Sequence, residues 1–245
     1  MIRALLVLPA LASCSGLVPA PDLPLDGVDP EAAWASHLDR HVDEGGRIDF
    51  AGMETERADL DRFVAWIAEP RADDREGAAE LAYLINAYNA LAMYGVLDSG
   101  RLPREKIRFF YLCEFQEGGR RISLYDLEND VIRALGEPRI HFALNCMVRS
   151  CPRLPRVPFQ AAILDGQLEA AAREFFNDPR HVQLVPDDET VLFSKILDWY
   201  EEDFLGAAPS LIAYANRYRD EPIPESWRVR FLDYDWSLNE TESAP

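Results

Sequence analysis

The sequence predicts an α+β fold: a single domain in which a buried central helix and several further helices pack on a mainly antiparallel sheet built from hairpins. Patterns typical of helices come first along the chain, and two patterns typical of β-hairpins follow. Strands and helices do not alternate regularly between them. Segregated elements of this kind are typical of α+β proteins rather than of parallel α/β sheets.

The first elements are expected to be helices. Pro30 lies near the start of a helix that Gly45 and Gly46 end, which matches the preference for proline at the start of a helix and glycine at its end. The stretch "RIDFAGM" is expected to be extended. Residues 54–68 form the next expected helix.

A helix over residues 81–97 is expected to be the centre of the core. Its sequence, "LAYLINAYNALAMYGVL", contains no charged side chain, so neither face is suited to solvent. Asn86 and Asn89 lie within it, and buried amides need hydrogen-bond partners. They are expected either to line a pocket or, as the simpler reading, to tie the helix to loop backbone.

Two hairpins and several helices complete the domain. "KIRFFYLCEFQEGGRRISL" predicts two strands around Gly118 and Gly119. Ser123 is placed to cap a helix that Gly136 ends. A long amphipathic helix, "PFQAAILDGQLEAAAREFFND", precedes a second hairpin formed by "HVQLV" and "TVLF". "SKILDWYEEDF" and "PSLIAYANRYRD" predict two more helices, and "WRVRFLDYDWSLN" predicts a closing strand.

The N-terminus predicts export and lipidation. Residues 1–13 combine Arg3 with an apolar run, and the stretch "LASC" resembles a lipobox, in which Cys14 becomes the lipidated first residue. Residues 15–29 are rich in proline and predict a tether, and residues 30–240 then form the globular domain. The expected location is the outer membrane, facing the periplasm.

Charge and motifs exclude several functions. A formal net charge of −18 argues against nucleic acid, and it limits contact with the membrane to the lipid anchor. Glycine-rich phosphate loops and the GxSxG motif are missing from the sequence. The sequence predicts no cofactor, and the expected partner is a small-molecule or peptide substrate or an envelope protein.

The stretch "RIHFALNCMVRSCPRLP" concentrates reactive side chains. Whether it is a strand or a helix, His141 and Asn145 share one face. The proline-rich turn allows Cys151 to return toward them. One hypothesis is therefore that Cys151 is a nucleophile, that His141 is its base, and that an amide such as Asn145 orients the imidazole.

Three alternatives stay open for the same stretch. Cys146 and Cys151 are close enough in sequence to form a disulfide, which is either structural or redox-active. A zinc site built with His141 and Cys113 has suitable donors, but its spacing is not that of known zinc motifs, so no metal site is predicted. The histidines of "HLDRH" are expected on a solvated helix face.

Glu128 and Arg133 are charged residues of one short predicted helix. They are expected either to contact a substrate or to form an ion pair within the protein.

Several blocks of sequence occur in the order typical of one family. They are "LINAYNAL", "ISLYDLENDVIR", "PRIHFALNCMVRSCPRL", "LEAAAREFFNDPRHVQL", "FSKILDWYEEDF" and "FLDYDWSLN". Through them the chain resembles the domain of unknown function 547 family. Some members of that family are fused to thiol-redox modules. The family usually has small residues between its two cysteines, where this chain has Met147, Val148 and Arg149.

The sequence thus leaves two functional hypotheses. The first is a thiol-dependent hydrolase or acyl transferase of the cell envelope that uses Cys151 with His141. The second is a non-catalytic binding or scaffold module of the envelope that contains a disulfide between Cys146 and Cys151.

Overall fold

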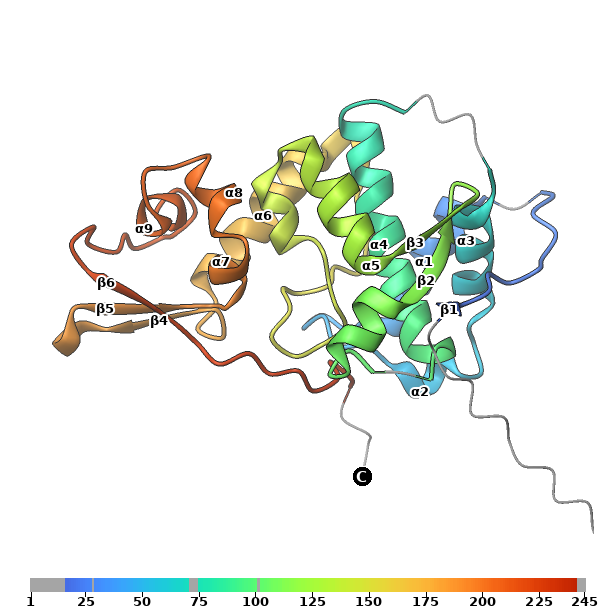
Figure 1. The fold of residues 1–245 in the computed structure, drawn as a ribbon, viewed down its shortest axis with the longest axis horizontal. Helices are drawn as coiled ribbons and strands as arrows, with labels where there is room; N and C mark the ends of the chain where they lie inside the picture. Colours follow the sequence, from blue (N-terminus) through green and yellow to red (C-terminus); the bar gives the residue numbers. More distant parts are fainter. Residues whose placement is uncertain (1–15, 28, 71–74, 101, 242–245) are drawn as a thin grey trace, which may run out of the picture.

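A computed structural model describes residues 16–27, 29–70, 75–100 and 102–241. They form one α+β body that is elongated in outline (Figure 1). It contains two hydrophobic cores, one at each end. The predicted signal segment and Cys14 lie outside the described residues. The α+β class is confirmed, but the hairpins belong to two separate three-stranded sheets, each with one parallel pair.

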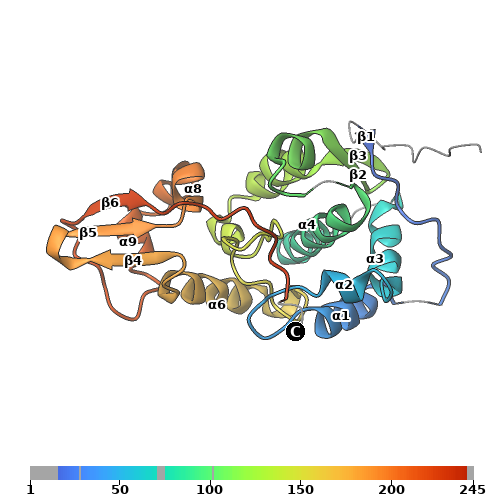
Figure 2. The same cartoon turned by 90° about the horizontal axis from the view of Figure 1, so that it is seen from below.

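The larger core surrounds the charge-free helix α4, as the sequence predicts. Figure 2 shows α4 between the layer of β1–β3 and the layer that contains α1 and α2. Residues 81–95 of α4 are all buried, which explains why neither face carries a charge. The helices of this part are α1 (Pro30–His41), α2 (Phe50–Met53), α3 (Ala58–Ala68) and α4 (Ala78–Asp98).

Two details of this part differ from the prediction. Phe50–Met53 forms the short helix α2 instead of extended chain, because Asp49 accepts a hydrogen bond from the Gly52 N–H and so caps a helical turn. The helix predicted over residues 54–68 begins at Ala58.

The first sheet packs against α4 through a glycine. It contains β1 (Gly16–Leu17), β2 (Cys113–Glu117) and β3 (Arg120–Ser123). The predicted β2–β3 hairpin is confirmed, and Gly118 and Gly119 both have positive φ in its turn. A Cβ on Gly95 would lie 2.9 Å from a ring carbon of Phe115. Any side chain at position 95 would therefore force the Phe115 ring to move.

The segment before β2 is helical, although its sequence predicts a strand. Residues Ile107–Leu112 form a π-helical turn, η1. Its Phe109 is fully buried against Gly95, whereas Ile107 and Tyr111 are exposed. Packing of one aromatic side chain into the core thus overrides the strand propensity of the segment.

The chain then crosses to the second core through short helices. Ser123 caps α5 as predicted, and Gly136 adopts the left-handed conformation that ends the run. The two ends of α6 belong to different cores, with Leu168 in the first and Phe175 in the second. These elements are α5 (Leu124–Asp126), the π-helix η2 (Leu127–Ile132), the 3₁₀ helices η3 (Arg133–Leu135), η4 (Pro138–Phe142) and η5 (Ala161–Ile163), and α6 (Leu164–Asn177).

The second core is covered by a sheet and three short helices. The predicted hairpin of β4 and β5 is confirmed, and the predicted closing strand, β6, pairs in parallel with β5. The chain after β6 returns to the first part, where Leu238 pairs with Val148 (Figure 1). The elements are β4 (Val182–Val185), the 3₁₀ turn η6 (Pro186–Asp188), β5 (Thr190–Phe193), α7 (Ile196–Trp199), α8 (Glu201–Leu205), α9 (Leu211–Ala215) and β6 (Arg228–Phe231).

The start of the predicted tether is docked on the body. Gly16 pairs with Cys113 in β1–β2, and Val18 is buried in the larger core. The Oη of Tyr94 donates a hydrogen bond of 2.9 Å to the Pro19 carbonyl. Residues 16–20 therefore differ from the free linker that their prolines suggest. Of the helices in the described parts of the chain, none is long and apolar enough to cross a membrane.

Candidate functional site

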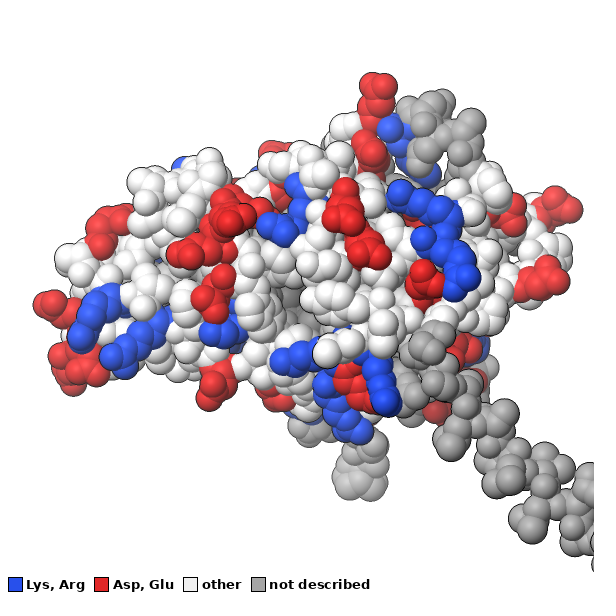
Figure 3. All heavy atoms as spheres, in the orientation of Figure 1, with Lys and Arg blue, Asp and Glu red and all other residues white. Residues whose placement is uncertain are grey.

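A cavity of about 500 Å³ opens between the two parts of the molecule. In Figure 3 it is the hollow at the centre of the face, and the rim around it is mostly uncharged. The walls come from η1, α4, α5, η2, η4, α7 and the loop that contains both bridged cysteines, together with the chain after β6. Eight of the 18 lining residues are aromatic: Tyr88, Phe110, Tyr111, Tyr125, Trp199, Tyr200, Tyr234 and Trp236.

A disulfide forms one wall of this cavity. Cys146 and Cys151 are bridged, with their Cα atoms 6.2 Å apart. The Sγ of Cys151 also accepts a hydrogen bond of 3.0 Å from the Cys146 N–H and one of 3.5 Å from the Tyr234 hydroxyl. In this bridged state Cys151 has no free thiolate, so it is not arranged as the nucleophile of the first hypothesis. The disulfide of the alternative hypothesis is present.

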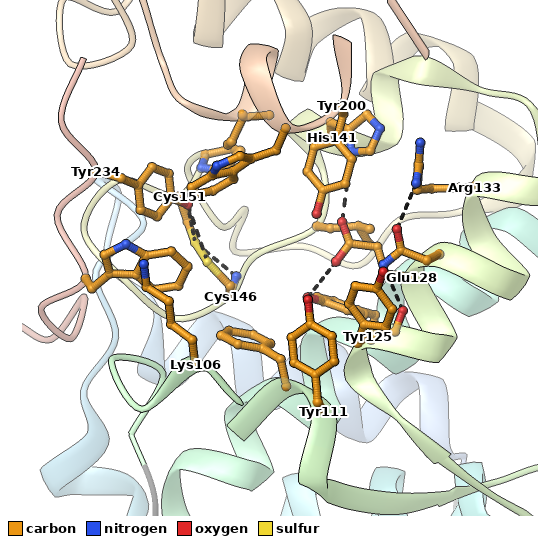
Figure 4. A pocket seen from close by; sticks show the side chains of 18 residues that line it. Lys106, Tyr111, Tyr125, Glu128, Arg133, His141, Cys146, Cys151, Tyr200 and Tyr234 are labelled. Carbon is orange, nitrogen blue, oxygen red and sulfur yellow. Dashed lines mark hydrogen bonds and ion pairs between the residues drawn. A yellow bond between two sulfur atoms is a disulfide. The ribbon is translucent and has the colours of Figure 1, made fainter. Parts of the chain in front are cut away.

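His141 lies on another wall of the cavity (Figure 4). It is held by the carboxylate of Asp203, which does not line the cavity. His141 belongs to the 3₁₀ helix η4, and its ring stacks on Tyr200 with centroids 4.0 Å apart. Its Nε2 is 2.7 Å from Oδ2 of Asp203. Because a carboxylate only accepts hydrogen bonds, Nε2 carries the proton. The group that orients the imidazole is therefore Asp203, whereas the sequence suggested an amide.

Asp203 also holds Arg133. The guanidinium donates two hydrogen bonds of 2.8 Å, one to each carboxylate oxygen. Hydrogen bonding from His141, and then from Arg133, keeps the pKa of Asp203 well below its usual range. One carboxylate of α8 therefore fixes two side chains of the cavity wall.

Glu128 points into the cavity without an ion pair to arginine or lysine among the described residues. Its Oε2 accepts a hydrogen bond of 3.1 Å from the Tyr88 hydroxyl. Burial first, and then the charge of Glu128, raises the pKa of the Tyr88 hydroxyl. The ion pair expected between Glu128 and Arg133 does not form, because Arg133 pairs with Asp203 instead.

The three asparagines of the prediction bind backbone groups. Asn86 bonds the N–H and C=O of Phe159, at 3.0 and 2.8 Å. Asn89 donates to the Ala143 carbonyl and accepts from the Asn145 N–H. The side chain of Asn145 bonds the loop that carries the disulfide, through Pro152 and Met147. None of the three lines the cavity among the described lining residues. All three therefore hold loop backbone in place, which is the structural role expected for Asn86 and Asn89.

The histidines outside the cavity are buried in the cores. Within the described ranges, no group of three or more His, Cys, Asp or Glu side chains is arranged to hold a metal ion. His37 and His41 are 0% and 3% exposed, so the expected solvated face is wrong. The ring of His37 packs between Trp34 and His41, and its Nε2 contacts the Met93 sulfur.

The sequence did not single out several residues of the site. Asp203 and Tyr200 belong to "DWYEEDF", which was predicted only as part of a helix. Tyr88 was predicted only as part of the buried helix over residues 81–97, and Tyr234 only as part of the closing strand. The signal available was compositional, because five tyrosines and two tryptophans line one cavity. Their sequence separation hides that relationship.

Comparison with known proteins identifies one family. Residues 73–176 match the family described as "Protein of unknown function, DUF547". No curated protein and no solved structure matches the chain. The matched range supplies Glu128, His141 and both bridged cysteines, whereas Asp203 and Tyr234 follow it in the sequence. The chain therefore carries a DUF547 domain at residues 73–176, completed at its cavity by the C-terminal segment.

Proposed function

We propose that this chain is a non-catalytic ligand-binding module of the cell envelope that receives a small molecule in the aromatic cavity. The observation that carries the proposal is a cavity of about 500 Å³ whose walls contain eight aromatic side chains and a few convergent polar groups. That size and composition are typical of small-molecule sites. The cavity also joins two parts of the fold, a frequent location for such sites.

The walls are held in place before any ligand arrives. The disulfide closes one wall, and Asn89 and Asn145 bond the backbone on either side of it. Asp203 fixes His141 and Arg133 on another wall. Binding to a preorganised site avoids part of the entropy cost of ordering side chains, which favours a binding role for this arrangement.

The envelope location rests on the lipidation motif at Cys14 and on the disulfide, since disulfides persist in oxidising compartments. Only Ser15 separates Cys14 from β1. A lipid anchor at Cys14 would therefore hold the body close to the membrane. The full-length chain expressed in a bacterium should appear in the outer-membrane fraction with an acylated N-terminus. Cys14→Ala should be soluble or retain its leader. An unmodified wild-type chain in the cytosol would contradict the location.

Binding is tested with a panel of aromatic fragments of neutral, anionic and cationic type, measured by thermal shift and calorimetry on the folded domain. We expect at least one fragment to bind saturably and to bind at least fivefold more weakly to Tyr111→Ala. Tyr111 lines the cavity and is 50% exposed, so its loss should leave the fold intact. Leu205→Ala is the matched control, with 44% exposure outside the cavity. No binding by any fragment, or equal losses in both variants, would contradict the proposal.

A further inference from the structure

One corner of the cavity contains two hydrogen-bond acceptors, Nδ1 of His141 and Oε1 of Glu128. Two acceptors cannot form a hydrogen bond with each other. The Nδ1 of His141 lies 4.0 Å from Oε1 of Glu128, which is longer than a hydrogen bond. With the ring proton on Nε2, where it bonds Asp203, Nδ1 presents a lone pair. Nδ1 is buried and has no hydrogen-bond partner among the described residues. A donor group from outside the chain would satisfy both atoms.

The charge of this corner is also unbalanced. The Glu128 side chain is only 13% exposed, and the hydrogen bond it accepts comes from the neutral hydroxyl of Tyr88. The nearby cation, Arg133, is already neutralised by both oxygens of Asp203. A partly buried carboxylate is more stable with an opposite charge beside it. This corner therefore favours a cation over an anion or a neutral group.

The aromatic walls add to the same preference. The faces of tyrosine and tryptophan rings attract cations. The cavity already contains one such contact, because Nζ of Lys106 is 4.0 Å from the Trp236 ring centroid. Figure 4 places Lys106 beside the disulfide wall, across the cavity from Glu128. The Lys106 ammonium therefore does not neutralise Glu128, and the corner beside Glu128 is open to a ligand.

We propose that the cavity binds a ligand bearing a protonated amine, whose N–H groups donate to Glu128 and to Nδ1 of His141 while its carbon frame packs on the aromatic walls. This inference rests on the proposed binding function and names the class of ligand. A carboxylate head group would meet the charge of Glu128. A quaternary ammonium would lack the N–H donors.

Four probes with one ring and different head groups test the class: benzylamine, benzyl alcohol, benzoate and benzyltrimethylammonium. Their dissociation constants are measured by calorimetry at neutral pH, where benzylamine is protonated. We expect benzylamine to bind at least tenfold more tightly than each of the other three. Glu128→Gln should weaken benzylamine at least tenfold and change benzyl alcohol less than twofold, because the amide still accepts from Tyr88. Asp130→Asn is the control: it removes the same charge from an exposed position of η2 and should change nothing.

Other outcomes separate this inference from the binding function. If benzyl alcohol or benzoate binds as tightly as benzylamine, and Tyr111→Ala weakens that binding, the cavity is a binding site but the ligand class is wrong. Equal binding of benzyltrimethylammonium would overturn the donation to His141. An unchanged benzylamine affinity in a folded Glu128→Gln, or no binding by any of the four probes, would also overturn the inference. The broader fragment panel tests the binding function separately.

Discussion

His141 and Asp203 are 62 residues apart in the sequence, yet Nε2 of the imidazole lies 2.7 Å from Oδ2 of the carboxylate. His141 belongs to the matched DUF547 range, and Asp203 follows it. The contact therefore joins the two parts of the fold at the wall of the cavity. Since Asp203 also holds Arg133, this carboxylate links both parts more strongly than a surface ion pair would.

We therefore expect Asp203→Ala to destabilise the protein by about 2–4 kcal/mol, because it leaves His141 and Arg133 without their partner. Unfolding in urea measures the change. Asp198→Ala is the matched control: its carboxylate pairs with Lys195 at the surface, and such pairs contribute about 0–1 kcal/mol. Equal losses in both variants would show that Asp203 acts as an ordinary surface residue.

Asn89→Ala should destabilise the protein by about 2–4 kcal/mol. Two buried backbone groups, the Ala143 carbonyl and the Asn145 N–H, lose their partner. The Asn129→Ala variant loses an exposed hydrogen bond to the Tyr125 carbonyl and a contact with Arg133. A smaller loss, of about 1 kcal/mol, is expected there. Chemical denaturation of both variants provides the comparison, and a larger loss in Asn129→Ala would argue against the role assigned to Asn89.

The disulfide closes a short loop. Replacing both cysteines, as Cys146→Ser with Cys151→Ser, should cost about 2 kcal/mol, because chain-entropy models predict a modest effect for so few residues. Peptide mapping of the domain without its leader should find the bridge between these cysteines and one thiol at Cys113, reactive only after denaturation because Cys113 is buried. Two further thiols in the unreduced, denatured protein would contradict the bridge.

Stability should fall as the pH falls below about 6.5. Burial lowers the pKa of His37 to about 3 and that of His181 to about 4. Between these values and 6.5, the unfolded chain binds protons that the folded chain does not. The free energy of unfolding therefore decreases on acidification, by up to about 1.4 kcal/mol per pH unit for each histidine.

His181→Phe should remove part of this dependence. His181 stacks on Phe175, and both of its ring nitrogens are buried without a hydrogen-bond partner in the described structure. A phenyl ring of similar shape should keep the stacking and add no proton to the unfolded state. Urea unfolding at pH 7 and pH 5 measures the slope. An unchanged slope in the variant would contradict the assignment.

Sequence patterns predicted those elements whose structure depends mainly on residues close together in the chain. The charge-free run of α4 indicated a buried helix, and Gly118 with Gly119 indicated the hairpin turn. The segment Ile107–Leu112 was assigned to a strand because its aromatic residues favour strands, and nothing in its own sequence reveals that Phe109 packs on Gly95. Long-range packing decided that element.

The candidate site was predicted only in part for the same reason. His141, Glu128 and both bridged cysteines were each singled out in the sequence, and in the structure all four line one cavity. Asp203 was not singled out, because a 62-residue separation leaves no spacing signal between it and His141. The arrangement of the cysteines was also open, since two cysteines five residues apart are compatible with either thiols or a bridge.

The most direct test of the binding cavity uses the indole N–H signals of the five tryptophans in an NMR titration with the fragment panel. Trp199 and Trp236 line the cavity, whereas Trp34, Trp66 and Trp227 do not. We predict that a binding fragment shifts the signals of Trp199 and Trp236 saturably and leaves the other three in place. Shifts of Trp34, Trp66 or Trp227 alone, or no shift of any indole by any fragment, would contradict the account.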